Sequence, residues 1–208
     1  MRYILNIGLV IAGLITAVSC QTKWNYVDTG LVNGRFDGTM YEYFHSNHYD
    51  WDSTLVLIEM AGLRDLFDGK DPEFKQVTFL GPTNHSIRRW MKEKKITSLR
   101  TLESEKCRAI ILRHVIKGKY MRDDIPAGKQ ENSQQVGEGG QLFTSAGGAN
   151  LWLYTFKEEY QGVAGTGSLN IYMYSVDKKV NIDIASSNIE PDNGVVHSLS
   201  YAYTLEEL

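Results

Sequence analysis

The sequence predicts an α+β fold in a single domain that spans residues 38–208. Two patterns carry this prediction. Apolar residues recur with helical spacing in the first half of this region, whereas alternating β-branched and aromatic runs follow after Lys119. A third observation is that the chain lacks an internal repeat, so helices followed by strands favour α+β over an alternating α/β arrangement.

The first 19 residues have the organisation of a secretory signal peptide. A basic start precedes an apolar run at 4–18, which is too short to span a membrane comfortably, and small residues precede Cys20. A cysteine in this place resembles a bacterial lipobox, although Ala17 stands where that motif more often has Leu. We therefore expect cleavage before Cys20 and lipidation of its sulfur, giving an anchor in the cell envelope, on the periplasmic or surface face of the outer membrane. A signal anchor, or an ordinary signal with a chance cysteine, is the alternative.

The second cysteine and the net charge argue against a disulfide-bonded domain, a cysteine nucleophile and a general nucleic-acid-binding protein. Once Cys20 is lipidated, Cys107 is the one remaining thiol, so no internal disulfide forms. The apolar helical surroundings of Cys107 favour a buried core residue over a nucleophile. The formal net charge is −3, and loss of Arg2 with the signal leaves 21 basic against 25 acidic residues, or −4. This balance is ordinary for a soluble domain and disfavours general nucleic-acid binding.

The region before the first strand is predicted to contain a tether and two helices. Residues 20–37 carry glycines and little periodicity, which indicates a tether. Helical spacing of apolar residues begins near Met40. A second helix is expected to begin at Asp52 or Ser53, which are both suitable capping residues.

A strand-to-helix corner follows. The strand begins at Val77 and stops at Pro82, because proline has no N–H and drives its predecessor into an extended conformation. Thr83 or Asn84 is then placed to cap a helix that continues through 86–91.

Another helix and a loop occupy the middle of the chain. The helix is expected over 101–116, with an inward side formed by Leu102, Cys107, Ile110, Ile111 and Val115. Residues 128–140 are polar and rich in glycine, which predicts a mobile, exposed connection.

The remainder of the chain predicts four strands, at 151–156, 169–174, 180–184 and 195–199. The first of them places Trp152, Tyr154 and Phe156 on one face and Leu151 and Leu153 on the other. Because both faces are apolar, that strand is either buried on both sides or presents one face as a contact surface.

Three short blocks stand in a characteristic order, at 78–84, 114–120 and 193–197. Their order and spacing resemble the fasciclin-like domain, an extracellular module, over roughly residues 38–203. The residues that carry the family motifs are Pro82, Thr83, Asn84, His114, Gly118, Tyr120, Asn193, Gly194 and His197.

The resemblance implies a fold and a class of function. The fold is a fasciclin-like β-wedge of about seven strands packed with several helices, and the family has no common enzymatic activity but is associated with adhesion and with matrix or surface binding. In animal members a Tyr-His pair in the second block is linked to integrin binding. Here Arg113 replaces that Tyr, so we interpret His114 as a hydrogen-bonded structural residue. Leu80-Gly81 stands where Phe-Ala is usual, which we interpret as a packing substitution.

The other motif residues have architectural explanations. Asn193 and Gly194 are expected to supply the positive φ angles of a tight turn that returns the last strand to the sheet. Gly118 is expected to allow a sharp exit toward Tyr120. His197 is expected to lie on the opposite face of its strand from Val196.

One cluster of possible metal ligands has a simpler interpretation. His45 and His48 have the spacing of one helix face, and Asp50 and Asp52 follow. A polar, exposed helix end, with aspartates that cap the next helix, explains the same pattern. We therefore expect no metal.

A catalytic triad can be drawn from five residues but lacks a supporting motif. The combinations are Ser86 or Ser198 with His114 or His197 and Asp183. No Gly-x-Ser-x-Gly elbow surrounds either serine. We expect no catalytic residue, no cofactor and no enzymatic activity.

The expected function is non-catalytic binding or adhesion at the cell envelope, with an envelope or matrix protein as partner. The alternative is an accessory glycan-binding surface protein of a polysaccharide-uptake system. Exposed aromatic side chains are the candidate contacts for either partner. They would come from the twelve tyrosines and from Trp24, Trp51, Trp90 and Trp152, most of which are expected to lie in the core.

Overall fold

The structure, a computed structural model, describes residues 34–208. The expected signal peptide, the lipidation site Cys20 and the side chain of Trp24 lie outside these residues. Residues 34–208 form one compact unit, which begins four residues before the predicted domain start at 38. Arg35 bridges to Glu190, and the N–H of Phe36 donates to the Glu190 carbonyl at 3.0 Å, so the end of the predicted tether lies along the domain.

Helices come first in the chain and strands dominate later, as the sequence predicts. The helices are α2 (Met40–Ser46), α3 (His48–Met60), α4 (Arg64–Phe67), α5 (Asn84–Glu93) and α6 (Ser104–Arg113), with short 3₁₀ turns η2 (Leu99–Thr101) and η3 (Arg122–Asp124). The strands are β1 (Val77–Gly81), β2 (Val115–Lys117), β3 (Gly128–Lys129), β4 (Glu138–Gly139), β5 (Gln141–Thr144), β6 (Asn150–Lys157), β7 (Leu169–Ser175), β8 (Val180–Ile189) and β9 (Gly194–Leu199).

Seven strands form one sheet in the order β2-β1-β9-β8-β7-β6-β5. All neighbouring pairs are antiparallel except β1 and β9, which run parallel from Val77↔Gly194 to Gly81↔Ser198. β1 is buried along its whole length, as expected for a strand paired on both sides and covered by helices.

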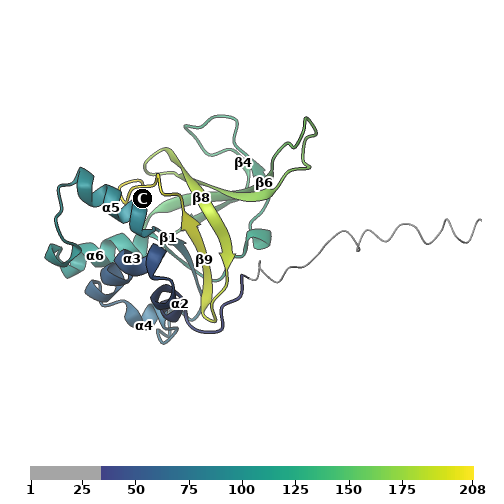
Figure 1. Cartoon of the computed structure of the whole chain (residues 1–208). Coiled ribbons are helices and arrows are strands. Elements are labelled where there is room, and N and C mark those ends of the chain that lie inside the picture. Colours follow the sequence, from purple (N-terminus) through teal and green to yellow (C-terminus); the bar gives the residue numbers. More distant parts are fainter. Residues whose placement is uncertain (1–33) are drawn as a thin grey trace, which may run out of the picture. The chain divides into compact units, whose positions relative to one another are not determined.

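The helices gather at one end of the sheet, around β1 and β9, while the long strands β6 and β8 extend away from them (Figure 1). The main core lies between the helices and the inner face of the sheet. It includes rings of Phe44, Trp51, Phe67 and Phe79 whose centroids lie 4.8–5.9 Å apart in the contacting pairs. In the described part of the chain, no helix is long and apolar enough to cross a membrane. The α+β class and the seven-stranded sheet are confirmed.

Three element boundaries differ from the predictions. The helix expected to begin at Asp52 or Ser53 begins at His48. Asn47 is the only residue between α2 and α3, and it is both the C-cap of the first helix and the N-cap of the second. The helix expected over 101–116 is confined to α6, since Val115 already belongs to β2. The connection at 128–140 contains a small hairpin, β3–β4, rather than only loop, although most of its residues are exposed.

Candidate functional site

The proline corner joins β1, α5 and α3. The Pro82 carbonyl accepts a hydrogen bond from the buried Thr54 hydroxyl at 2.6 Å. Thr83 occupies the N-cap position of α5, as predicted, but its side chain makes no capping bond. Instead its hydroxyl lies 3.3 Å from that of Ser86, inside the domain.

Asn84 does not cap α5 but connects it to the start of α3. Its Oδ1 accepts from the Ser53 N–H at 2.6 Å, and its Nδ2 donates to the carbonyls of His48 and Tyr49 at 2.9 and 2.7 Å. The side chain is 2% exposed and fully hydrogen-bonded. Of the two residues predicted to cap α5, Thr83 therefore occupies the N-cap position, whereas the buried Asn84 amide satisfies its hydrogen bonds with α3.

His114 is a buried structural histidine, as predicted. Its Nδ1–H donates to the Ile110 carbonyl at 2.8 Å, so Nε2 is the acceptor for the Tyr203 hydroxyl at 2.7 Å. Burial lowers its pKa to about 4, with nearby Arg113 acting in the same direction. The ring is neutral at pH 7 and links the end of α6 to the C-terminal segment.

His197 is equally buried but has the opposite tautomer. Its Nδ1 accepts from the Asn188 N–H at 3.2 Å, and its Nε2–H donates to the Tyr120 carbonyl at 2.9 Å. Burial lowers its pKa to about 4. It thus ties β9 both to β8 and to the segment after β2.

Gly118 makes the sharp exit toward Tyr120 that the sequence predicts. Its φ of +102° lies in the region that favours glycine. The Thr78 hydroxyl fixes this turn, donating to the Gly118 carbonyl at 2.8 Å and accepting from the Tyr120 N–H at 2.9 Å.

Asn193 and Gly194 do not act through positive φ angles at both positions. Asn193 is absent from the positive-φ residues of the described chain, and its side chain instead binds two helices. Its Oδ1 accepts from the Met40 N–H at 2.7 Å, and its Nδ2 donates to the Phe67 carbonyl at 2.9 Å. Gly194 is required by close approach, because a Cβ there would overlap the Val77 carbonyl of β1.

The three sequence blocks therefore meet in one substructure. β1 pairs with β2, which follows His114, and with β9, which follows Asn193. The Leu80 N–H also donates to the His114 carbonyl at 2.9 Å. Their polar side chains bond to other parts of the domain interior rather than converging on a cavity.

The other reactive clusters do not assemble into sites. His45 and His48 lie on separate helices, and His48 Nδ1 contacts Asp52 at 2.6 Å at the exposed surface. Residues 34–208 contain no group of three His, Cys, Asp or Glu side chains placed to hold a metal.

The serines considered for a triad are bonded to the backbone. Ser86 donates to the Ser200 carbonyl at 3.1 Å, and Ser198 to the Leu199 carbonyl at 3.5 Å. Cys107 is fully buried, as predicted, and burial raises the pKa of its thiol. Arg113, at the position of the family's Tyr, donates to the Leu208 backbone oxygen at 3.0 Å.

The described tryptophans are core residues, in line with the expectation that most of the aromatic side chains are buried. Trp51, Trp90 and Trp152 are all at most 3% exposed, with Trp152 Nε1 donating to the Gly139 carbonyl at 3.0 Å. The exposed aromatic side chains of the described chain are Tyr49, Phe156, Tyr160 and Tyr201.

The outer face of β6 and β7 carries a continuous aromatic row. The register pairs Trp152 with Tyr174 and Tyr154 with Tyr172, and alternation adds Phe156 to the same face. The rings of Trp152 and Tyr154 stack at 4.3 Å, those of Tyr154 and Tyr172 at 5.2 Å. The strand is thus buried on both sides near Trp152 and becomes exposed toward Phe156, which is 41% exposed. We call Tyr154, Phe156 and Tyr172 the outer-face aromatic row.

Polar groups border this row. A shallow hollow of about 270 Å³ is lined by the row together with Lys129, Gln130 and Glu158. Burial raises the pKa of Tyr172 to about 12, reinforced by its hydrogen bond to Glu158. An aromatic floor with a polar rim is suited to a sugar ring or an amphipathic protein side chain. The alternation of apolar residues at 151–156 is the signal that locates this surface.

The fold is a helix-flanked β domain. Its polar motif side chains form hydrogen bonds within the domain interior and do not form a reaction centre. The family model of the fasciclin domain matches residues 50–202. No curated protein sequence matches the chain. Among solved structures, a similar one is a domain pair from the insect cell adhesion molecule fasciclin I, with 18% identity and a TM-score of 0.47. That match covers 80% of this chain and 46% of the insect chain, so this protein spans less than half of that length.

The chain belongs to the fasciclin domain family, because the matched span is well over half of its 208 residues. This confirms the resemblance drawn from the three sequence blocks. Fasciclin domains are generally non-catalytic adhesion domains.

Proposed function

We propose that this protein is a lipid-anchored adhesion protein of the cell envelope that binds a partner non-catalytically through the outer-face aromatic row. The observation that carries the proposal is that the motif residues and the surface aromatic residues have separate roles in the structure. The motif side chains bond within the framework, whereas Phe156 and Tyr172 expose ring surface on a sheet face. An exposed apolar surface rimmed by polar groups is typical of interaction sites.

A glycan partner is the second candidate, and the geometry of the row supports it. Tyr154 and Tyr172 are nearly parallel, with an interplanar angle of 17°, and Phe156 extends the row. Sugar rings present apolar C–H faces to such rings, while Glu158 and Gln130 are placed to bond hydroxyls. A protein partner would use the same rings as anchors.

Removal of the Phe156 and Tyr172 rings is expected to weaken binding without unfolding the domain. We expect Phe156→Ser/Tyr172→Ser to reduce sedimentation of the purified protein with isolated cell envelopes at least tenfold, because these rings supply the contact area. The matched control is Tyr49→Ser, which removes a tyrosine that is 75% exposed on α3.

Pretreatment of the envelopes distinguishes the two partners. Binding that survives protease and is lost after periodate oxidation indicates a glycan, and the reverse indicates a protein. Equal binding by the double variant and the wild type would contradict the assignment of the surface.

The anchor on Cys20 has its own test. We expect radiolabelled palmitate to enter the wild-type protein in cells and not Cys20→Ala, and the variant to leave the membrane fraction. The Cys107→Ala variant, which removes the other thiol, is the control and is expected to retain the label. Equal labelling of Cys20→Ala would contradict the anchor.

A further inference from the structure

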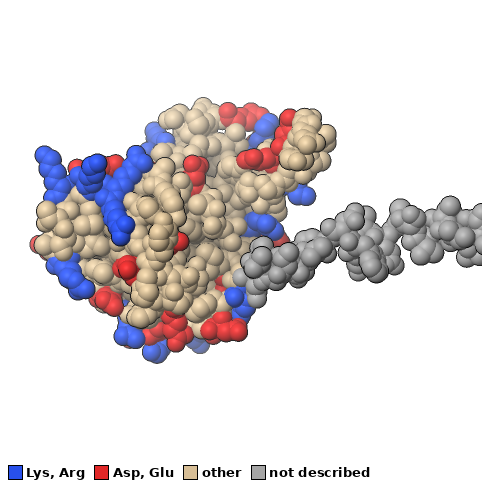
Figure 2. All heavy atoms as spheres, viewed as in Figure 1, with Lys and Arg blue, Asp and Glu red and all other residues tan. Residues whose placement is uncertain are grey.

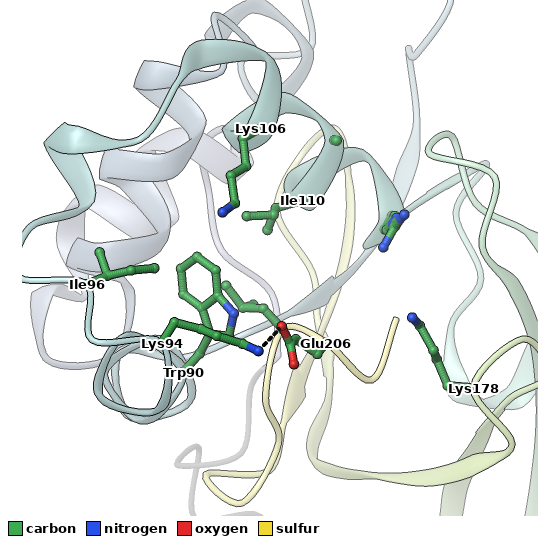
Figure 3. A pocket seen from close by; sticks show the side chains of 10 residues that line it. Trp90, Lys94, Ile96, Lys106, Ile110, Lys178 and Glu206 are labelled. Carbon is green, nitrogen blue, oxygen red and sulfur yellow. Dashed lines mark ion pairs between the residues drawn. The ribbon is translucent and has the colours of Figure 1, made fainter.

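A second hollow lies at the helical end of the domain, away from the outer-face aromatic row. It has a volume of about 800 Å³, within the range of about 300–1,000 Å³ of small-ligand sites. It is surrounded by the end of α5, one side of α6, the turn between β7 and β8, and the C-terminal segment. Figure 3 shows Trp90, Lys94 and Glu206 on one side of it and Lys178 across from them, with Lys106 and Ile110 on a third side. We call it the basic hollow.

The charge of the basic hollow is strongly asymmetric. Its lining contains four cations, Lys94, Lys106, Arg113 and Lys178, and the single anion Glu206, which leaves a formal charge of +3 in a chain whose net charge is −3. Lys and Arg side chains also gather over this end of the domain, near α5 (Figure 2).

The cations of the basic hollow differ in how far they are already paired. Lys94 Nζ lies 2.6 Å from Glu206 Oε1, and Arg113 donates to the Leu208 backbone oxygen at 3.0 Å. Lys106 and Lys178 form no ion pair within 4 Å in residues 34–208, and both side chains are exposed; Lys106 Nζ lies 5.9 Å from the centroid of the Trp90 ring, and Asp177 adjoins Lys178. These two cations stand on different elements, so they face a ligand from two directions.

Helix α6 is built with one face toward the core and one toward the basic hollow. Cys107 and Ile111 are buried in the core, whereas Lys106, Ile110 and Arg113 line the hollow at helical spacing. Ala109 lies between them and is exposed, so its small side chain leaves the space open.

The walls of the basic hollow favour one class of anion. Its aromatic residue, Trp90, is 3% exposed, so nucleic-acid bases have no ring on which to stack. The strands β2 and β5 at the sheet edges do not line it, so an extended acidic peptide has no backbone to pair with. Apolar side chains such as Ile96, Ile110 and Leu205 stand among the cations. A compact ligand with several acid groups and apolar C–H faces matches this lining.

We propose that the basic hollow binds an acidic oligosaccharide, of the uronic-acid class, with Lys106 and Lys178 holding its carboxylates. This inference rests on the proposed binding function and names a ligand class for a separate surface. Rigid sugar rings hold the carboxylates apart, and Lys106 on α6 and Lys178 in the β7–β8 turn belong to different elements of the lining. Glu206 opposes such a ligand and occupies Lys94, so its charge limits the affinity.

The probe for the test is trigalacturonate, titrated into the purified protein by calorimetry. We expect binding that weakens with added salt. The fully methyl-esterified trisaccharide, which has the same rings without charge, is expected to bind at least tenfold more weakly. Inorganic phosphate is the second comparison, and equal competition by phosphate would show an ion site rather than a saccharide site.

Variants then assign the binding to the basic hollow. Lys106→Glu/Lys178→Glu is expected to lower the affinity for trigalacturonate at least tenfold, and Ala109→Trp to lower it by filling the space. Lys75→Glu/Lys117→Glu makes the same change in net charge at exposed lysines outside the hollow and should leave the affinity within twofold. Glu206→Gln is expected to raise the affinity severalfold, which no loss of folding would produce.

The results separate this inference from the proposed function. Absence of heat with trigalacturonate, or equal affinity in the Lys106→Glu/Lys178→Glu variant, overturns the basic hollow as a saccharide site. Binding to envelopes through the outer-face aromatic row is measured independently, so it can persist when the titration fails. Conversely, trigalacturonate binding can persist in Phe156→Ser/Tyr172→Ser.

Discussion

Replacing Gly194 by alanine is expected to lower the free energy of unfolding by about 3 kcal/mol or more. The added Cβ would overlap the carbonyl oxygen of Val77 and approach the Met40 Cε at 3.1 Å. The Val77 oxygen belongs to the backbone of β1, so relief requires β1 and β9 to separate at the start of their parallel pairing. For a chain of this size such a loss lowers the melting temperature by about 10 °C.

Urea unfolding and thermal melting measure this effect. The matched control is Gly162→Ala, since a Cβ at Gly162 meets nothing within 4 Å and only its φ of +81° is strained. We expect the control to cost about 1 kcal/mol. Equal stability of the two variants would show that the approach of β9 to β1 is looser than the structure has it.

Acidification is expected to destabilise the domain steeply between pH 6.5 and pH 4. His114 and His197 are neutral and buried in the folded state, with pKa values lowered to about 4, whereas the unfolded chain binds their protons near pH 6.5. The unfolded state therefore carries more protons in this window, so stability falls as pH falls from 6.5 and the loss levels off below 4. The expected loss is about 3 kcal/mol for each histidine.

The test compares the pH dependence of urea unfolding in the wild type and in His114→Gln/His197→Gln. Glutamine does not titrate, so the variant is expected to begin less stable at pH 7.5 and to lose much less between pH 6.5 and pH 4. Titrating carboxylates such as Glu190, whose pKa its bond to Lys119 lowers, are common to both proteins and cancel in the comparison. Parallel curves would contradict the burial of neutral imidazoles.

Much of the framework could be predicted because local patterns determine it. The break at Pro82 and the strands at 151–156 and 195–199 follow from residue geometry and β propensity, and the structure contains all three features. His114 was also predictable as a structural residue, because it ends an apolar helix. His197 was expected only on the face of its strand opposite Val196, and its burial follows from the covering of both faces of β9. The family blocks added the order of the elements, which periodicity alone does not give.

The partners of the motif side chains could not be predicted, since they lie far away in sequence. Asn193 binds Met40 across 153 residues and Asn84 binds Ser53 across 31, so local capping rules could not choose between Thr83 and Asn84 as the cap of α5. Gly81 is explained by the Trp51 ring, which fills the place of its Cβ, and nothing near Gly81 in sequence indicates this. The basic hollow could not be predicted from the sequence for the same reason, because its cations come from the end of α5, from α6 and from the β7–β8 turn.

The central claim is that motif residues hold the framework while the outer face binds. One paired measurement tests it: envelope sedimentation and urea unfolding at pH 7.5 for Phe156→Ser/Tyr172→Ser and for His114→Gln/His197→Gln. The account predicts that the aromatic variant remains folded at pH 7.5 without urea, with a modest loss of stability from the half-buried Tyr172 ring, and fails to bind. It also predicts that the histidine variant unfolds at a lower urea concentration and, while folded, binds as the wild type does. A histidine variant that is as stable as the wild type but does not bind, beside an aromatic variant that binds fully, would contradict it.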